Sequence, residues 1–140
     1  MSISIEILHN RRMSKLKEQT EKRKNRSMSK NYGYTILDKS YKLVDGANRI
    51  NVNNRLNHEQ AKNKLVYLCK KQGYKVYSEA IFTNKRRSDI YLPDLCKVIE
   101  VRDTESIKKF NEKIKHYPEG LDIIEFTVKE ILDDNFNLLI

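Results

Sequence analysis

The most regular pattern of apolar and polar positions lies in the second half of the chain. Between residues 57 and 72, apolar side chains recur three or four positions apart, at Ala61, Leu65, Leu68 and Cys69. This is the spacing of one helical face. Asn57 precedes the run and Gln60 follows three positions later, an arrangement similar to a capping box. Gly73 stands where a helix commonly ends in a left-handed residue. The pattern predicts a helix from residue 57 to about residue 72.

Four later segments have the composition of β-strands. They are rich in aromatic and β-branched residues, which favour strands, and they cover residues 74–82, 88–92, 97–102 and 121–126. Pro93 and Asp94 end the second strand, because proline cannot continue a sheet ladder. The second and third strands are therefore expected to form a hairpin.

Two further helices complete the predicted order. Thr104 is placed to cap a helix with apolar residues at helical spacing, namely Ile107, Phe110, Ile114 and Tyr117. Thr127 and Glu130 have the spacing of a capping box for a short last helix. The elements follow the order α-β-β-β-α-β-α. We therefore predict an α/β domain with a small mixed central sheet flanked by helices.

The first part of the chain is less regular. Residues 1–8 alternate and can form a short strand, whereas residues 11–27 are polar nearly all round. Such a segment is either an exposed helix or disordered until it meets a partner. Residues 45–57 are rich in turn formers and have no periodicity. We therefore place the boundary there, with an N-terminal extension at 1–56 and the regular domain at 57–140.

Composition narrows the class of protein. With 140 residues, 39% of them hydrophobic and 34% charged, the chain suits one domain with a modest core. No apolar run reaches the roughly 18 residues that span a bilayer, and the N-terminus lacks the apolar stretch of a secretory signal. We therefore expect a cytoplasmic protein with no membrane partner. The two cysteines have no zinc-binding spacing, and Cys69 is expected to be a buried thiol.

The positive charge is concentrated in the N-terminal extension. The formal net charge is +9, and residues 1–30 hold nine Lys or Arg against three Asp or Glu. Residues 58–140 are nearly balanced, with fifteen basic and fourteen acidic residues. A basic arm on a nearly neutral domain indicates a handle for polyanions such as DNA. The arm residues expected to contact phosphates are Arg11, Arg12, Lys22, Arg23 and Lys24. The alternative is a solubilising tail.

The candidate chemistry lies in the predicted hairpin. Glu100 and Arg102 share one face of the third strand, because side chains alternate along a strand. Asp89 and Glu100 are equally distant from the turn, so we expect them to be cross-strand neighbours. Two adjacent carboxylates repel each other, and a hard divalent cation relieves that repulsion. The alternative is an exposed strand face on which the acids pair with Arg102 and Arg87.

These residues resemble the split motif of the PD-(D/E)XK nuclease superfamily. The resemblance rests on Ser88-Asp89-Ile90 followed by Ile99-Glu100-Val101-Arg102, and it covers about residues 57–132. It is closest to small Holliday-junction-resolvase-like and competence-associated branches. The resemblance implies a restriction-endonuclease-like core and DNA hydrolysis with Mg²⁺ or Mn²⁺ bound by Asp89 and Glu100. It also implies that Glu59 assists as an auxiliary ligand, and, by analogy with junction resolvases, a possible homodimer.

One position departs from that motif. The usual lysine is Arg102 here, which cannot act as a general base but can bind phosphate in a fork. Lys97 and Lys108 are candidates to replace the lysine in space. The basic run Lys85, Arg86 and Arg87 lies next to Asp89 and is expected either to contact phosphate or to form a solvated turn. Glu79 is more readily a surface residue than a further ligand.

Two other function classes remain open. The departure at Arg102 favours a catalytically weakened nuclease-fold protein that acts as a nucleic-acid-binding module. A third class is a protein-interaction module that uses the basic arm and the apolar tail at residues 136–140. That tail could instead pack back onto the sheet or form a homodimer surface. Salt-dependent DNA binding separates the first two classes from the third.

Overall fold

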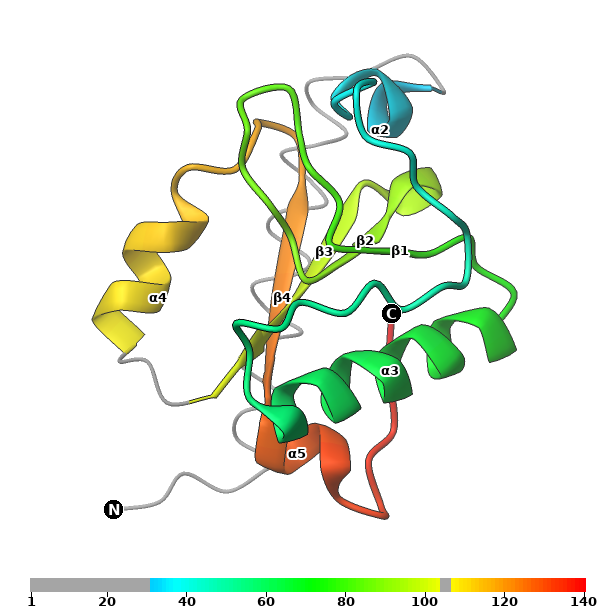
Figure 1. Ribbon diagram of the computed structural model, residues 1–140, viewed down its shortest axis with the longest axis vertical. Coiled ribbons are helices and arrows are strands. Elements are labelled where there is room, and N and C mark those ends of the chain that lie inside the picture. Colours follow the sequence, from blue (N-terminus) through cyan, green and yellow to red (C-terminus); the bar gives the residue numbers. More distant parts are fainter. Residues whose placement is uncertain (1–30, 104–106) are drawn as a thin grey trace.

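A computed structural model describes residues 31–103 and 107–140 of the chain (Figure 1). The backbone of this part forms four α-helices and four strands. The helices are α2 (Tyr32–Thr35), α3 (Leu56–Lys71), α4 (Ile107–Ile114) and α5 (Val128–Leu132). The strands are β1 (Tyr77–Ser78), β2 (Ile90–Leu92), β3 (Lys97–Arg102) and β4 (Asp122–Thr127). A 3₁₀ turn, η1 (Pro93–Leu95), joins β2 to β3.

The four strands form one mixed sheet in the order β1-β2-β3-β4. β1, β2 and β3 pair antiparallel, whereas β3 and β4 pair parallel along their full length. A parallel pair needs a crossover connection, and α4 lies in that connection. The prediction of an α/β fold with a small mixed sheet and flanking helices is confirmed.

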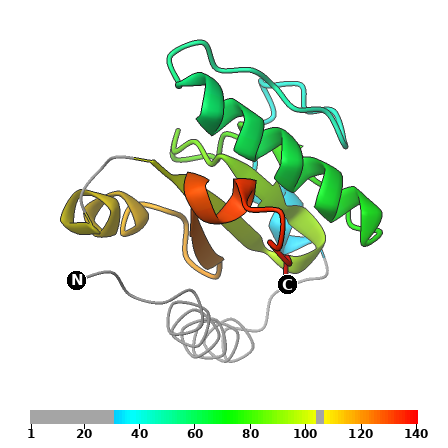
Figure 2. The same ribbon diagram turned by 90° about the horizontal axis from the view of Figure 1, so that it is seen from below.

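One face of the sheet packs against α3 and α5 (Figure 2). The strands contribute alternate residues to this layer, which follows from the two-residue repeat of a strand. The apolar side chains that make up the layer include Ala61, Leu65, Val66, Cys69, Ile90, Leu92, Ile99, Val101, Ile124, Phe126, Val128 and Ile131. We call this set the apolar layer. Cys69 belongs to it as a free, buried thiol, as predicted.

The opposite face carries a smaller apolar cluster. It contains residues of the segment after α2 together with side chains of β2, β3 and the segment that follows α4. Tyr91 lies at its centre, where its ring meets Phe82 edge to face at 4.9 Å and its hydroxyl donates a hydrogen bond to the Gly33 carbonyl at 2.6 Å. A Cβ atom at Gly33 would lie 1.9 Å from the Pro93 carbonyl oxygen, so only glycine fits there.

Residues 31–55 lie against the domain that follows them. Thr83 donates its backbone N–H to the Ile36 carbonyl at 2.8 Å, and Leu37 forms a β-bridge with Phe82. The C-terminal tail also packs inward: Leu138 is buried in the apolar layer, and Phe136 meets Phe126 edge to face at 5.1 Å. Among the roles predicted for the tail, packing back onto the sheet is the one that the structure shows.

The ends of several elements differ from the predictions. Helix α3 begins after Arg55, with no side-chain cap, so the expected capping box at Asn57 is wrong. The strand predicted at 74–82 covers only two residues, and it ends at Glu79, which adopts a left-handed conformation with φ of 53°. Gly73, with φ of 88°, and the capping box of Thr127 with Glu130 are as predicted. Among the described residues, no helix is both long and apolar enough to cross a membrane.

Candidate functional site

Asp89 lies where β2 and β3 separate. Its carboxylate oxygen Oδ2 accepts a hydrogen bond of 2.8 Å from the backbone N–H of Val101, and its own carbonyl accepts one of 3.0 Å from Glu79 N–H. The side chain therefore takes over a position that a ladder hydrogen bond would otherwise occupy. His58 of α3 approaches from the other side, with Nε2 3.8 Å from Asp89 Oδ2 and 3.2 Å from the Val101 carbonyl oxygen. Asp89 is thus fixed by contacts to two elements.

Glu100 is buried beside Asp89. The pairing of β2 and β3 places Ile90 opposite Ile99, so continuing the register by one residue brings Asp89 opposite Glu100. The side chain of Glu100 is 1% exposed, and Lys113 of α4 reaches it, with Nζ 4.0 Å from Oε2. On its other side Glu100 is paired with Glu125 in β4. The predicted cross-strand relation of Asp89 and Glu100 therefore agrees with the register.

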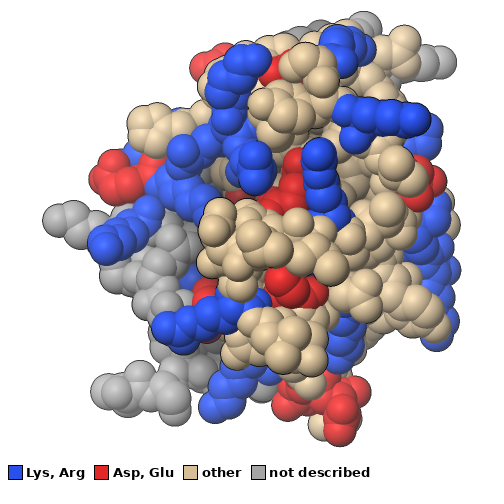
Figure 3. All heavy atoms as spheres, viewed as in Figure 1, with Lys and Arg blue, Asp and Glu red and all other residues tan. Residues whose placement is uncertain are grey.

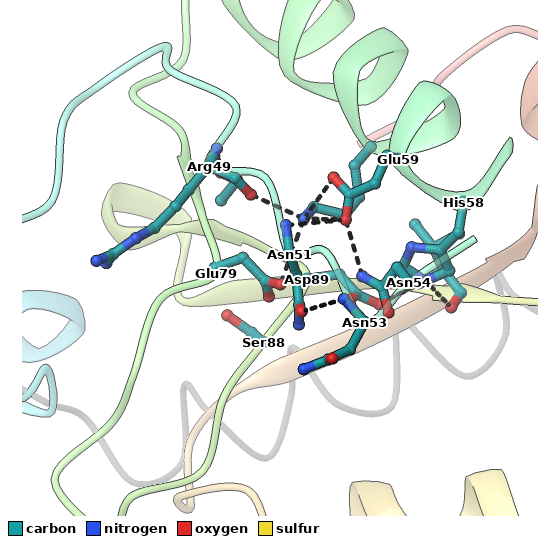
Figure 4. A network of polar contacts seen from close by, with 12 residues as sticks. Arg49, Asn51, Asn53, Asn54, His58, Glu59, Glu79, Ser88 and Asp89 are labelled. Atoms are coloured by element: carbon teal, nitrogen blue, oxygen red, sulfur yellow. Dashed lines mark hydrogen bonds and ion pairs between the residues drawn. The ribbon is translucent and has the colours of Figure 1, made fainter. Parts of the chain in front are cut away.

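Glu79 and Lys62 form a buried pair next to Asp89. Lys62 of α3 is fully buried, and its ammonium group lies 3.4 Å from Glu79 Oε1. It also donates hydrogen bonds to both oxygens of Glu59 at 3.1 Å and to the Arg49 carbonyl at 3.0 Å. The left-handed backbone of Glu79 is unusual for a residue with a side chain and marks local strain. Figure 4 shows this network between α3 and the ends of the strands.

Glu59 serves the loop before α3. Its Oε1 atom accepts hydrogen bonds from the Asn51 backbone N–H at 3.2 Å and from the Asn54 side chain at 2.9 Å. Burial alone would raise the pKa of Glu59, but the hydrogen bonds from Asn54 and Lys62 and the charge of Lys62 outweigh it, and the pKa is lowered. Glu59 is therefore a carboxylate that holds Lys62 and the loop 51–54 in place.

Four acids lie in or directly beside the four strands, two within β3 and β4 and two at the adjoining ends of β1 and β2. This set, which we call the acidic row, consists of Glu79, Asp89, Glu100 and Glu125. Each acid has a basic partner at 3.4 to 4.0 Å: in the same order, Lys62, His58, Lys113 and Arg102. These separations exceed the 2.7–2.9 Å of a tight charge-assisted hydrogen bond. Glu79, Glu100 and Glu125 therefore each lie near a cationic side chain, and Asp89 lies near the imidazole of His58.

An open pocket of about 310 Å³ exposes part of this row. Its described lining residues are Asn51, Asn54, Glu79, Lys85, Arg86, Arg87, Asp89 and Lys113. We call it the acidic pocket. It brings two carboxylates together with four cationic side chains. In the space-filling view, acidic atoms near the middle of the face lie between Lys and Arg side chains (Figure 3). Arg102 is not among the described lining residues; it lies towards β4, with Nε 3.9 Å from Glu125 Oε2.

In the basic run at 85–87, two side chains contact other parts of the protein and one is open to a ligand. Lys85 forms an ion pair with Asp38, and Arg86 donates a 2.8 Å hydrogen bond to the Lys113 carbonyl near the end of α4. The exposed side chain of Arg87 has no ion pair or hydrogen bond with any residue that the structure describes. Arg87 and Lys113 are thus the cations best placed to receive an anion in the pocket.

Sequence reasoning missed two of these residues and undervalued a third. Lys62 lies in the buried stripe of α3, four positions after His58 and three before Leu65, so a lysine within an apolar stripe was the available signal. Lys113 has no comparable signal, because its place depends on how α4 crosses the sheet. Glu79 was expected at the surface but is 4% exposed. Lys97 lies at the other end of β3, opposite Asp122, and cannot serve this pocket.

Several expectations fall outside this description. Arg11, Arg12, Lys22, Arg23 and Lys24 belong to residues 1–30, and the side chain of Lys108 also lies outside the described part. Within the described part, no three His, Cys, Asp or Glu side chains are grouped so that they could hold a metal ion.

Comparison with known proteins adds no relative. No protein-family model, curated protein or solved structure matches this chain.

Proposed function

We propose that the chain is a nuclease that hydrolyses DNA phosphodiester bonds at the acidic pocket with the help of Mg²⁺ or Mn²⁺. The observation that carries the proposal is the meeting of Glu79 and Asp89 with Arg87 and Lys113 in one open pocket, where Lys113 also lies 4.0 Å from buried Glu100. Cations on the rim attract a phosphate, and carboxylates below it supply the oxygen ligands that a hard metal ion prefers.

The arrangement of the elements supports the same proposal. A helix leads into three antiparallel strands, and a second helix then leads to a strand parallel to the third. We propose that this arrangement is the restriction-endonuclease-like core that the motif around Asp89 and Glu100 implies. Such a core would explain why the acids gather where β2 and β3 separate. Because fold likeness alone does not establish an activity, the assignment depends on the site.

The acids of the pocket suit a hard divalent metal ion that keeps part of its water shell. Mg²⁺ keeps several waters and commonly takes one or two protein carboxylates together with substrate phosphate. We propose that Asp89 and Glu100 provide those carboxylates, with Glu79 beside them. A bound ion of this type would polarise the phosphate and favour hydroxide as the attacking group. A site that uses only two protein carboxylates agrees with the described residues, among which no group of three potential ligands exists.

The other residues of the site would contact the phosphate or hold the acids in position. Arg87 and Lys113 would contact the oxygens of the scissile phosphate, and charge-assisted hydrogen bonds of this kind are the strong ones. Val101 N–H and His58 fix the Asp89 carboxylate, while Lys62 fixes Glu79 and Glu59. Arg102 would act indirectly, by balancing the charge of Glu125 next to Glu100.

The decisive experiment is a cleavage assay with matched variants. Wild type, Asp89→Asn, Glu100→Gln and the exposed control Asp133→Asn are incubated with single-stranded, duplex and branched DNA in Mg²⁺ or Mn²⁺. We expect wild type and Asp133→Asn to cut at equal rates, and the two site variants to lose about 100-fold or more, as expected when a transition-state charge contact is removed. Absence of cutting by wild type, or equal cutting by the site variants, refutes the proposal.

A second candidate is a nucleic-acid-binding module without turnover. The ion pairs of Glu79, Glu100 and Glu125 favour it, because acids that already have cationic partners need no metal ion. Calorimetry with Mn²⁺ separates the two. The nuclease binds the ion in an Asp89-dependent way, whereas the module binds DNA in a salt-dependent way without binding the ion.

A further inference from the structure

A second pocket of about 210 Å³ adjoins the acidic pocket. It is lined by Tyr41, Arg49, Ile50, Asn51, Val52, Glu79, Ile81 and Arg87. Three of these residues, Asn51, Glu79 and Arg87, also line the acidic pocket. A ligand that fills both pockets therefore passes over a short shared wall.

The chemistry of the second pocket differs from that of the first. Ile50 is 69% exposed, Val52 89% and Tyr41 40%, so three apolar or aromatic side chains stand open to solvent around one hollow. Single exposed apolar residues are ordinary, but here they share the hollow with two arginines, Arg49 and Arg87. Apolar surface beside cations suits a flat, uncharged ring attached to an anion.

The rim of this pocket is held by polar side chains of α3 and β1. The Arg49 carbonyl accepts a hydrogen bond from buried Lys62, and Arg49 N–H donates to the Ser78 hydroxyl. Asn51 N–H donates to Glu59, as described above. The backbone that carries Ile50 and Val52 is therefore anchored on both sides of Ile50, and its position is fixed before any ligand arrives. Such pre-organisation lowers the entropic cost of binding.

We propose that the second pocket receives the base of an unpaired nucleotide whose phosphate lies in the acidic pocket. This inference rests on the proposed function and deepens it, because it assigns the substrate class as DNA with an unpaired base next to the cut. Tyr41 and the arginine planes supply stacking surfaces, as in other single-strand sites. In a duplex the base stays stacked in the helix and cannot enter such a pocket without being flipped out.

The test measures DNA binding in EDTA, so that no metal-dependent step enters. Labelled oligothymidine and a duplex hairpin of equal length are titrated with wild type, Tyr41→Ala and Val52→Asp by fluorescence anisotropy. The controls are Tyr67→Ala and Val44→Asp, whose exposed residues line neither pocket. We expect both pocket variants to weaken single-strand binding about tenfold, which is within the range for losing one stacked base, and to change duplex binding less than twofold.

A second measurement localises the base. Thymidine 5′-monophosphate is added to protein with labelled methyl groups, and we expect the resonances of Ile50 and Val52 to shift, whereas that of Val44 stays in place. Equal losses of single-strand and duplex binding, unchanged binding by both pocket variants, or unshifted methyl resonances would overturn the inference.

The outcomes distinguish this inference from the proposed function. If oligothymidine binding depends on Tyr41 and Val52 but no DNA is cut, the base pocket stands and the nuclease proposal fails. If wild type cuts DNA while both pocket variants bind and cut single strands normally, the nuclease proposal stands and the base pocket fails.

Discussion

The apolar layer and the acidic row are built on the same strands but follow opposite rules. On one face of β3, Ile99 and Val101 are packed among the apolar side chains of α3 and α5. Between them in sequence, Glu100 is equally buried yet faces a lysine 4.0 Å away. Burying apolar surface stabilises the fold, whereas burying a charge costs free energy that its partners must offset. The apolar layer therefore stabilises the fold, whereas the acidic row carries a cost in free energy.

The contrast also runs through α3. Its buried stripe consists of apolar residues except at His58 and Lys62, and these two contact the acidic row. The apolar part of this stripe packs in the apolar layer, and its polar end contacts the acidic row, so one helix contacts both regions. Because departures from local consistency are expected at functional sites, this end of α3 supports the proposed site.

The largest expected effect comes from Lys62→Met. This change leaves Glu59 and Glu79 without their shared cation in a buried place, and breaking a buried pair typically costs about 3–5 kcal/mol. We expect the free energy of unfolding, measured by urea denaturation, to fall by about that amount. Lys71→Met, at an exposed position on the same helix, is the control and should change little.

A double variant sharpens the result. In Lys62→Met with Glu79→Gln, one of the two stranded charges is gone, so part of the lost stability should return. If Lys62→Met unfolds at the same urea concentration as wild type, the acidic row is not the cost that the comparison assigns to it.

The second-largest expected effect comes from Leu65→Ala, which tests the apolar layer. Leu65 is completely buried in the apolar layer, three positions from Lys62. Removing a buried leucine side chain loses transfer free energy and leaves a cavity, at a typical cost of about 2–5 kcal/mol. We expect a loss of about 3 kcal/mol in urea denaturation and unchanged DNA binding in EDTA. A loss of DNA binding in folded protein would mean that the two regions are not separable.

The apolar layer was largely accessible from the sequence. Alternation and helical spacing depend on residues close in the chain, so β3 and the capping box at Thr127 were predicted at their observed places. The cross-strand relation of Asp89 and Glu100 also followed, because a short hairpin fixes its own register.

The acidic row was only partly accessible, for a physical reason. Lys113 and Arg102 take their partners from the packing of distant elements, and residues 31–55 reach the sheet through contacts that no local pattern encodes. The composition of residues 74–82 favours a strand, but the strand ends before Glu79, whose backbone is left-handed. Tertiary structure overrides local propensity here. Chemistry that depends on several elements meeting is the part that a single sequence reveals least.

The smallest expected effect belongs to an ion pair outside the acidic row. Lys85 donates a hydrogen bond to Asp38, and this contact, followed by the bonds from Ser40, lowers the pKa of Asp38 from 3.8 to about 2. A carboxyl whose pKa is depressed in the folded state adds stability that is fully present above pH 3.8 and is lost as the pH falls towards 2. Between those values wild type should lose stability faster than Asp38→Asn, while near neutral pH the two should be similar because surface pairs contribute little.

Urea denaturation at pH 7, 4 and 2.5, with Asp134→Asn as an exposed control, measures this difference. A large loss in Asp38→Asn at pH 7 would show that an ion pair outside the row supports the fold as strongly as Lys62 does, and the distinction between buried and exposed charge would then fail.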